Sequence, residues 1–102
     1  METIRTNGFT AKDLFNATSA TPIKDVKGLQ INVVDVMVTE KDGEVVGYMK
    51  ADDGTLYATI SATVNEQIAA LAEILNDMES VPVVVITQTS KNGREYFMLE
   101  MQ

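Results

Sequence analysis

The chain has 102 residues and a formal net charge of −7, from 15 acidic and 8 basic residues. This length allows one small domain with a single modest hydrophobic core. Histidine and cysteine are both absent, which excludes imidazole catalysis, a Ser-His-Asp triad, disulfides and metal sites built on thiolate or imidazole. The excess of acidic residues disfavours non-specific binding to nucleic acid, because neutralisation of phosphates by basic residues supplies most of the affinity in such binding.

The sequence contains no pattern that indicates a membrane or secretory segment. No apolar run approaches the roughly 20 residues that span a bilayer. No basic and then apolar leader opens the chain. We therefore expect a cytosolic protein without a membrane partner.

Residues 1–29 are predicted to form a loosely ordered N-terminal segment. Within it, Thr10 followed by Asp13 resembles a capping box and predicts a short helix through Phe15. The turn-forming residues of 16–22 would end that helix.

Alternating apolar residues and a high β-branched content predict five strands further along the chain. The predicted strands cover residues 30–39, 44–50, 55–60, 83–88 and 94–101. Glycine-containing turns separate several of them, and Lys91-Asn92-Gly93 is a candidate type I′ turn.

One longer helix is predicted between the third and fourth strands, over about residues 64–77. Its apolar residues recur at helical spacing and predict a stripe that packs on the core: Val64, Ile68, Leu71, Leu75 and Met78. Thr63 with Glu66 three residues later predicts a capping box at the helix start.

The order of three strands, a helix and two strands is typical of the OB-fold. That fold is a five-stranded Greek-key barrel whose surface binds oligonucleotides or oligosaccharides. We therefore predict one OB-fold domain over residues 1–102, with the barrel in 30–102. A plain antiparallel α+β domain with the same element order is the competing architecture.

No residue pattern indicates catalysis, so we expect no enzyme, no cofactor and no metal site. The chain lacks a glycine-rich phosphate loop and a nucleophile with a positioned base. Glu40, Asp42 and Glu44 alternate across a hairpin tip but lack the ligand pattern of a calcium loop, which favours a solvated tip.

The tyrosines and nearby bases give a more informative pattern. If Leu56, Ala58 and Ile60 face the core, then Tyr57 lies on the polar face of its strand. Strand alternation lets the other tyrosines point outward as well. Bases of a single strand stack on exposed rings for roughly 1–3 kcal/mol each, while cations follow the backbone. The predicted DNA-binding residues are Tyr48, Lys50, Tyr57, Lys91, Arg94 and Tyr96.

At these positions the sequence resembles the single-stranded DNA-binding protein of protein-primed Bacillus phages, the phi29 group. The likeness is strongest over residues 51–58, which include the Asp-Gly-Thr-Leu-Tyr motif, and continues through 60–61 and 63–75. It resumes over 89–93, 96–97 and Leu99. The resemblance implies a protein that coats displaced single strands during phage DNA replication in the host cytoplasm. It also implies that Tyr57 stacks on DNA.

Two other functions remain as alternatives at the level of sequence. The net charge of −7 would suit an acidic interaction module, such as a DNA mimic or an inhibitor that occupies a basic cleft. An oligosaccharide-binding barrel would fit the fold, but the chain has no tryptophan for a sugar platform. Single-stranded DNA is the predicted partner, while a homo-oligomer and contacts with replication proteins stay open.

Overall fold

The computed structural model describes residues 3–102, and most of its regular structure is one mixed sheet. The sheet has seven strands in the order β2-β5-β4-β3-β6-β7, with β1 beside β3. All strand pairs are antiparallel except β2 with β5. The strands are β1 (Ile4–Arg5), β2 (Thr21–Pro22), β3 (Gln30–Lys41), β4 (Glu44–Ala51), β5 (Leu56–Thr59), β6 (Val81–Thr89) and β7 (Glu95–Met101).

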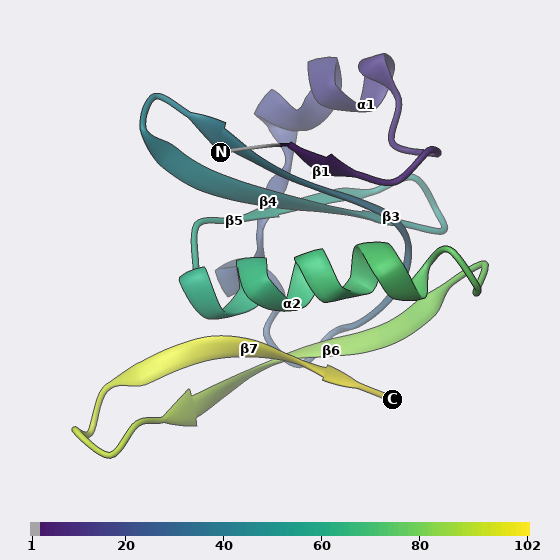
Figure 1. The fold of residues 1–102 in the computed structure, drawn as a ribbon. Coiled ribbons are helices and arrows are strands. Elements are labelled where there is room, and N and C mark those ends of the chain that lie inside the picture. The colour runs from purple at the N-terminus through teal and green to yellow at the C-terminus, as the bar shows by residue number, and fades with distance from the viewer. Residues whose placement is uncertain (1–2) are drawn as a thin grey trace.

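The sheet curls into a half-barrel, and the longer helix lies in its hollow. Figure 1 shows α2 (Ala62–Ile74) between the β3-β4-β5 part of the sheet and the β6-β7 ribbon. Each of the five predicted strands is present, as β3 to β7. Their bounds differ slightly, since β3, for example, ends at Lys41 and not at residue 39. The fold is therefore mainly β, as predicted.

The N-terminal segment contains short regular elements, although we expected loose order there; residues 1 and 2 lie outside the described part. It contains β1, β2, the helix α1 (Ala11–Asn16) and the 3₁₀ turns η1 (Ala17–Ser19) and η2 (Ile23–Val26). The capping box predicted for α1 is confirmed. The Asp13 backbone N–H donates to Thr10 Oγ1 at 3.2 Å, and the Thr10 N–H donates to Asp13 Oδ2 at 2.9 Å.

The start of α2 differs from the prediction, because Ser61 caps the helix. Its hydroxyl accepts a hydrogen bond from the Val64 N–H at 3.3 Å, so the chain enters the helix before Thr63. The capping box predicted for Thr63 and Glu66 is therefore wrong. The helix also ends at Ile74, short of residue 77, which leaves Met78 outside it and 50% exposed.

The two hairpin turns differ in geometry. Asp42 (φ 54°) and Gly43 (φ 80°) both have the positive φ that a type I′ turn between β3 and β4 requires. In the β6-β7 turn only Gly93 has a positive φ (79°), and its N–H donates to the Ser90 carbonyl at 2.9 Å. The type I′ prediction for Lys91-Asn92-Gly93 is wrong, since a wider loop closed by a left-handed glycine joins these strands.

Helix α2 approaches β4 closely at Gly47. The Asn65 side chain donates from Nδ2 to the Val45 carbonyl at 3.3 Å. A Cβ at Gly47 would collide with Asn65 Oδ1 and would lie 2.8 Å from Ile68 Cδ1. The absence of a side chain at Gly47 therefore allows the helix to lie on the strand.

A side chain of α2 also satisfies the open edge of β7. Gln67 Nε2 donates to the Leu99 carbonyl at 2.8 Å, and the Leu99 N–H donates to Gln67 Oε1 at 2.7 Å. The amide of Gln67 thus forms with Leu99 the pair of hydrogen bonds that a neighbouring strand would form.

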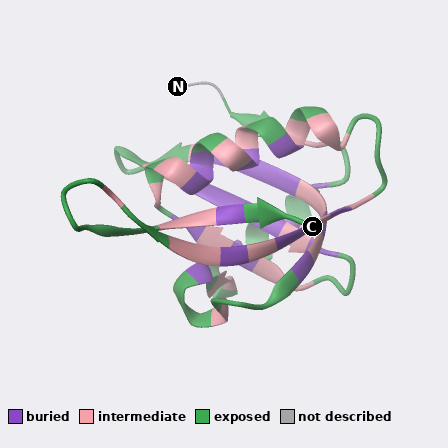
Figure 2. Cartoon of the chain, turned by 90° about the horizontal axis from the view of Figure 1, so that it is seen from below, coloured by how far each residue is buried: buried purple, intermediate pink, exposed green. Residues whose placement is uncertain are grey.

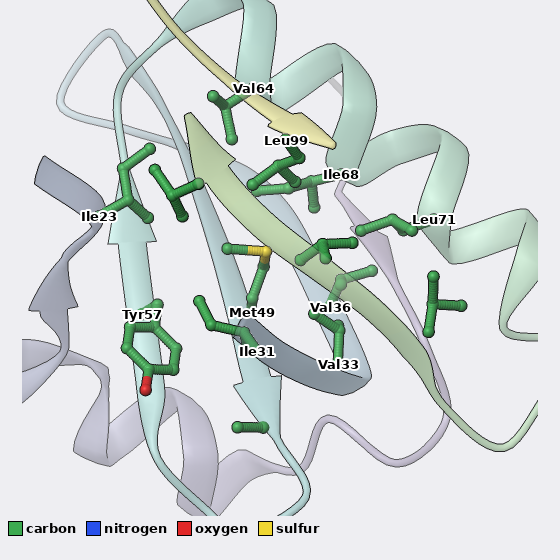
Figure 3. Close-up of a cluster of buried hydrophobic side chains, with 14 of the residues drawn as sticks. Ile23, Ile31, Val33, Val36, Met49, Tyr57, Val64, Ile68, Leu71 and Leu99 are labelled. Atoms are coloured by element: carbon green, nitrogen blue, oxygen red, sulfur yellow. The ribbon is translucent and has the colours of Figure 1, made fainter. Parts of the chain in front are cut away.

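Two apolar clusters lie on opposite faces of the sheet. The main core joins α2 to the inner face of the strands and includes Val36, Met49, Ile68 and Leu99 (Figure 3). The second cluster lies beneath the N-terminal segment and consists of Phe9, Ala17, Met37 and Tyr48. The N-terminal segment therefore covers an outer face of the sheet that the sequence suggested was open.

Candidate nucleic-acid interface

The six predicted DNA-binding residues separate into a covered group and an exposed group. Tyr48, Lys50 and Tyr57 lie on the central strands β4 and β5, where other elements cover them. The other three lie on the β6-β7 hairpin: Lys91, Arg94 and Tyr96. Figure 2 shows that the tip of this hairpin is exposed and projects from the rest of the molecule.

The prediction that the Tyr57 ring faces solvent is wrong. The residue is 7% exposed and belongs to the main core, where Figure 3 shows its ring near Ile31 and Met49. Tyr57 is the Cα partner of Met49, and cross-strand partners share a face, so both point inward. Burial, with a smaller contribution from the Asp53 carboxylate, raises the pKa of the Tyr57 phenol above 10.0.

The face of β5 that we expected to point toward the core therefore points outward. Leu56 and Ala58 pack against the second cluster and not against the main core. The following Ile60 is 65% exposed. Both faces of this short strand carry apolar atoms, which is why alternation alone led to the inverted assignment.

Tyr48 points away from the main core, as predicted, but it is not exposed. Its ring lies 6.2 Å from the Phe9 ring, centroid to centroid, at an interplanar angle of 36°. The N-terminal segment that carries Phe9 leaves Tyr48 only 7% exposed. The prediction of an open ring at this position is wrong because residues far away in the sequence cover it.

Lys50 forms an ion pair with a carboxylate of α1. Its Nζ lies 3.1 Å from Asp13 Oδ2, and no other ion pair within 4.0 Å joins residues of the described range 3–102. Burial raises the pKa of the Asp13 carboxyl, but hydrogen bonds from Thr10 and Lys50 outweigh it and hold the pKa below 3.8. The ion pair links α1 to β4. It also neutralises Lys50, which we expected to contact a phosphate.

The three residues of the exposed group lie at or next to the turn of the β6-β7 hairpin. Tyr96 is 38% exposed and pairs across the strands with Gln88. The next outward pair, Ile86 with Met98, is half-buried and extends the apolar surface from the ring. Lys91 lies in the turn and Arg94 directly after it, and both are exposed. The hairpin thus combines one accessible ring with two cations.

An apolar groove beside this hairpin was not predicted from the sequence. It has a volume of about 490 Å³ and lies between η2, β5 and the inner face of β7. Its lining residues are Pro22, Ile23, Lys24, Val46, Ala58, Thr59, Ile60, Ser61 and Phe97. No local sequence pattern indicated the groove, because its lining residues come from separate elements of the chain.

A curled, mainly β sheet with an accessible ring and cations on one hairpin suits the class of single-strand nucleic-acid binders. The chain belongs to the family of phage single-stranded DNA-binding proteins, because the model of that family matches residues 3–102. The resemblance inferred from the tyrosine motif is therefore confirmed. Comparisons with curated proteins and with solved structures found no match.

Within the described range 3–102, no helix has both the length and the apolar character that crossing a bilayer requires.

Proposed function

We propose that this protein binds single-stranded DNA without sequence preference and protects displaced strands during phage-type replication. The observation that carries the proposal is the β6-β7 hairpin, which presents Tyr96 close to two cations near its turn, Lys91 and Arg94. Stacking on a ring does not depend on base identity, because every base has a π face. Family membership supports the same function.

In this proposal the hairpin makes the first contact with DNA. Tyr96 stacks on a base, and Lys91 and Arg94 meet neighbouring phosphates. Gln88 and Met98 flank the ring on the same face and would limit its movement. We further propose that residues 1–102 act as one domain of OB type, in which β3 to β7 correspond to the five barrel strands.

The proposal gives no direct DNA contact to the covered residues Tyr48, Lys50 and Tyr57 in the present conformation. Contact of Tyr48 and Lys50 with DNA would require Phe9 and Asp13 to leave the sheet, because they cover the ring and pair the lysine. Contact of Tyr57 with DNA, which the family resemblance implies, stays a prediction. In the present conformation its ring packs the core, so a Tyr57 variant would change stability as well as affinity.

Titration of dT oligomers against the protein tests the proposal, with tyrosine fluorescence as the readout for the wild type and gel shift as the readout for the Tyr96 variants. Replacing Tyr96 by Ala should weaken binding by about 1–3 kcal/mol, the range for one stacked base. The Tyr96→Phe variant keeps the ring and should bind like the wild type. Far-ultraviolet circular dichroism checks that both variants fold alike.

Two results would contradict the proposal. If Tyr96→Ala bound DNA with unchanged affinity, the Tyr96 ring would not be part of the interface. Failure of the wild-type protein to bind any single strand at low salt, with co-purification of a basic protein, would favour the acidic interaction module instead.

A further inference from the structure

We propose that the groove between η2, β5 and β7 is a second base-binding subsite, which receives one unstacked base of the same single strand. This inference rests on the proposed function, because it assigns the groove to the DNA that the hairpin binds. The residues that carry it are Lys24, Ala58, Ile60, Ser61 and Phe97.

The position of the groove connects it with the hairpin. Tyr96 and Phe97 are consecutive on β7 and therefore point to opposite faces of the strand. Tyr96 faces outward, whereas Phe97 lines the groove. A strand that leaves the Tyr96 ring and crosses the β7 edge would meet the Phe97 ring next.

The chemistry of the groove suits a base and not a charged group. Its walls are mostly apolar, and Ile60 is 65% exposed at its margin. Its volume of about 490 Å³ falls within the roughly 300–1,000 Å³ that small-molecule pockets occupy. Apolar walls would accept any base, in agreement with binding that does not read sequence.

The polar groups of the groove are placed at its rim. Ser61 accepts a hydrogen bond from the Val64 N–H, so its own O–H can donate to the edge of a base. Lys24 is exposed and supplies a cation for the adjoining phosphate. No carboxylate lines the groove within the described part of the chain, although the protein has 15 acidic residues. The groove is therefore a site that a polyanion can approach.

A tryptophan reporter tests whether a base enters the groove, since the natural chain has no tryptophan. In Ile60→Trp, saturating dT oligomer should quench at least half of the emission, as a base stacks on the indole. The matched control is Met78→Trp, which is also exposed but lies away from the groove, and its emission should stay nearly constant. Binding of both variants is verified separately by gel shift.

Charge variants give a second readout that does not depend on fluorescence. Ile60→Glu should weaken dT binding about tenfold, or about 1.4 kcal/mol, while Met78→Glu, with the same change in charge, should stay within about twofold. Lys24→Gln should reduce the steepness of the salt dependence by about 0.7, the value for one phosphate contact on a single strand. Lys41→Gln, at the tip of the β3-β4 hairpin, is its control and should leave that slope unchanged.

The outcomes distinguish failure of the groove proposal from failure of the proposed DNA-binding function. If the wild type does not bind dT, both proposals fall. If the wild type binds but Ile60→Trp is not quenched, or both glutamate variants bind alike, only the groove proposal falls. Equal quenching by the matching duplex would also overturn it, because paired bases cannot enter the groove.

Discussion

At the scale of single residues, the three tyrosines occupy three different environments. Tyr57 packs in the main core, Tyr48 packs under Phe9, and Tyr96 lies in the open on the hairpin. Their chemistry is the same, so burial decides which ring can meet a ligand without rearrangement. The hairpin tyrosine is the one to which the structure gives direct access.

The buried phenol of Tyr57 should ionise later than an ordinary tyrosine. Because its pKa in the folded state is raised above 10.0, the stability that its neutral form contributes is complete below that value. This stability is lost as the pH rises through the raised pKa. Titration of the tyrosinate absorbance should show a late phase that Tyr57→Phe lacks and Tyr96→Phe retains. A late phase that persists in Tyr57→Phe would contradict the assignment.

The Asp13 carboxylate should stabilise the fold in a pH-dependent way. Its pKa is held below 3.8, so its contribution is complete above that value and is lost as the pH falls through the lower, folded-state pKa. At neutral pH, Asp13→Ala should cost about 1–2 kcal/mol, through the lost cap and the unpaired lysine.

Urea denaturation of Asp13→Ala at several pH values checks this prediction. The difference from the wild type should shrink as the pH is lowered below the ordinary range of aspartate. Asp25→Ala is the control, since Asp25 is exposed in η2 and has no ion pair within 4.0 Å in the described part of the chain. A loss for Asp13→Ala that does not change with pH would show that the contribution is not electrostatic.

At the scale of elements, local patterns predicted where strands and helices occur but not what covers them. Long β-branched runs and glycine turns were sufficient to locate β3, β4, β6 and β7. The faces of β5 could not be assigned, because Tyr57 and its neighbour Leu56 both carry large apolar surfaces. The cover over Tyr48 depends on Phe9, a contact between residues 39 positions apart that no local pattern encodes.

The candidate site was predictable to a similar extent. The exposure of the hairpin residues was predictable, because a turn with basic residues beside an alternating strand is a local feature. The groove was missed because its walls come from η2, β5 and β7, which only the curl of the sheet brings together. The ion pair of Lys50 was hidden for the same reason, since its partner lies on α1.

The contact between α2 and β4 should tolerate no side chain at residue 47. Gly47→Ala should destabilise the protein by about 1–3 kcal/mol, as overpacked cores do, because the new methyl group collides with the Asn65 side chain. Urea denaturation followed by circular dichroism measures the loss.

A double-mutant cycle with Asn65→Ala provides the control. The added loss caused by Gly47→Ala should be smaller in the Asn65→Ala background, because the main obstacle has been removed. Strict additivity of the two substitutions would contradict the proposed contact.

At the scale of the whole molecule, the charge distribution reconciles an acidic protein with a polyanionic ligand. The net charge of −7 describes the total surface, while the proposed path of DNA holds Lys24, Lys91 and Arg94. On this proposal, so few cations would neutralise few phosphates, and stacking would supply most of the affinity. Such a binder depends on high local concentration more than on electrostatic attraction.

The salt dependence of binding should therefore be shallow. Three phosphate contacts on a single strand predict a slope of about −2 for log affinity against log salt concentration. Replacing Lys24, Lys91 and Arg94 together by Gln should bring the slope close to zero. The matched triple variant, in which Arg5, Lys12 and Lys41 are replaced by Gln, should leave the slope unchanged. If both triple variants changed the slope equally, the proposed path of DNA would be refuted.

The bond pair between Gln67 and Leu99 has a consequence for solubility. A protein that coats DNA must be abundant, and β7 is the last strand of an open sheet. At high concentration, the unpaired backbone of such a strand would recruit the same strand of another copy and begin a fibre. Because Gln67 occupies the middle of this edge from within the same chain, we expect it to hinder such edge-to-edge pairing at the concentrations that coating DNA would require.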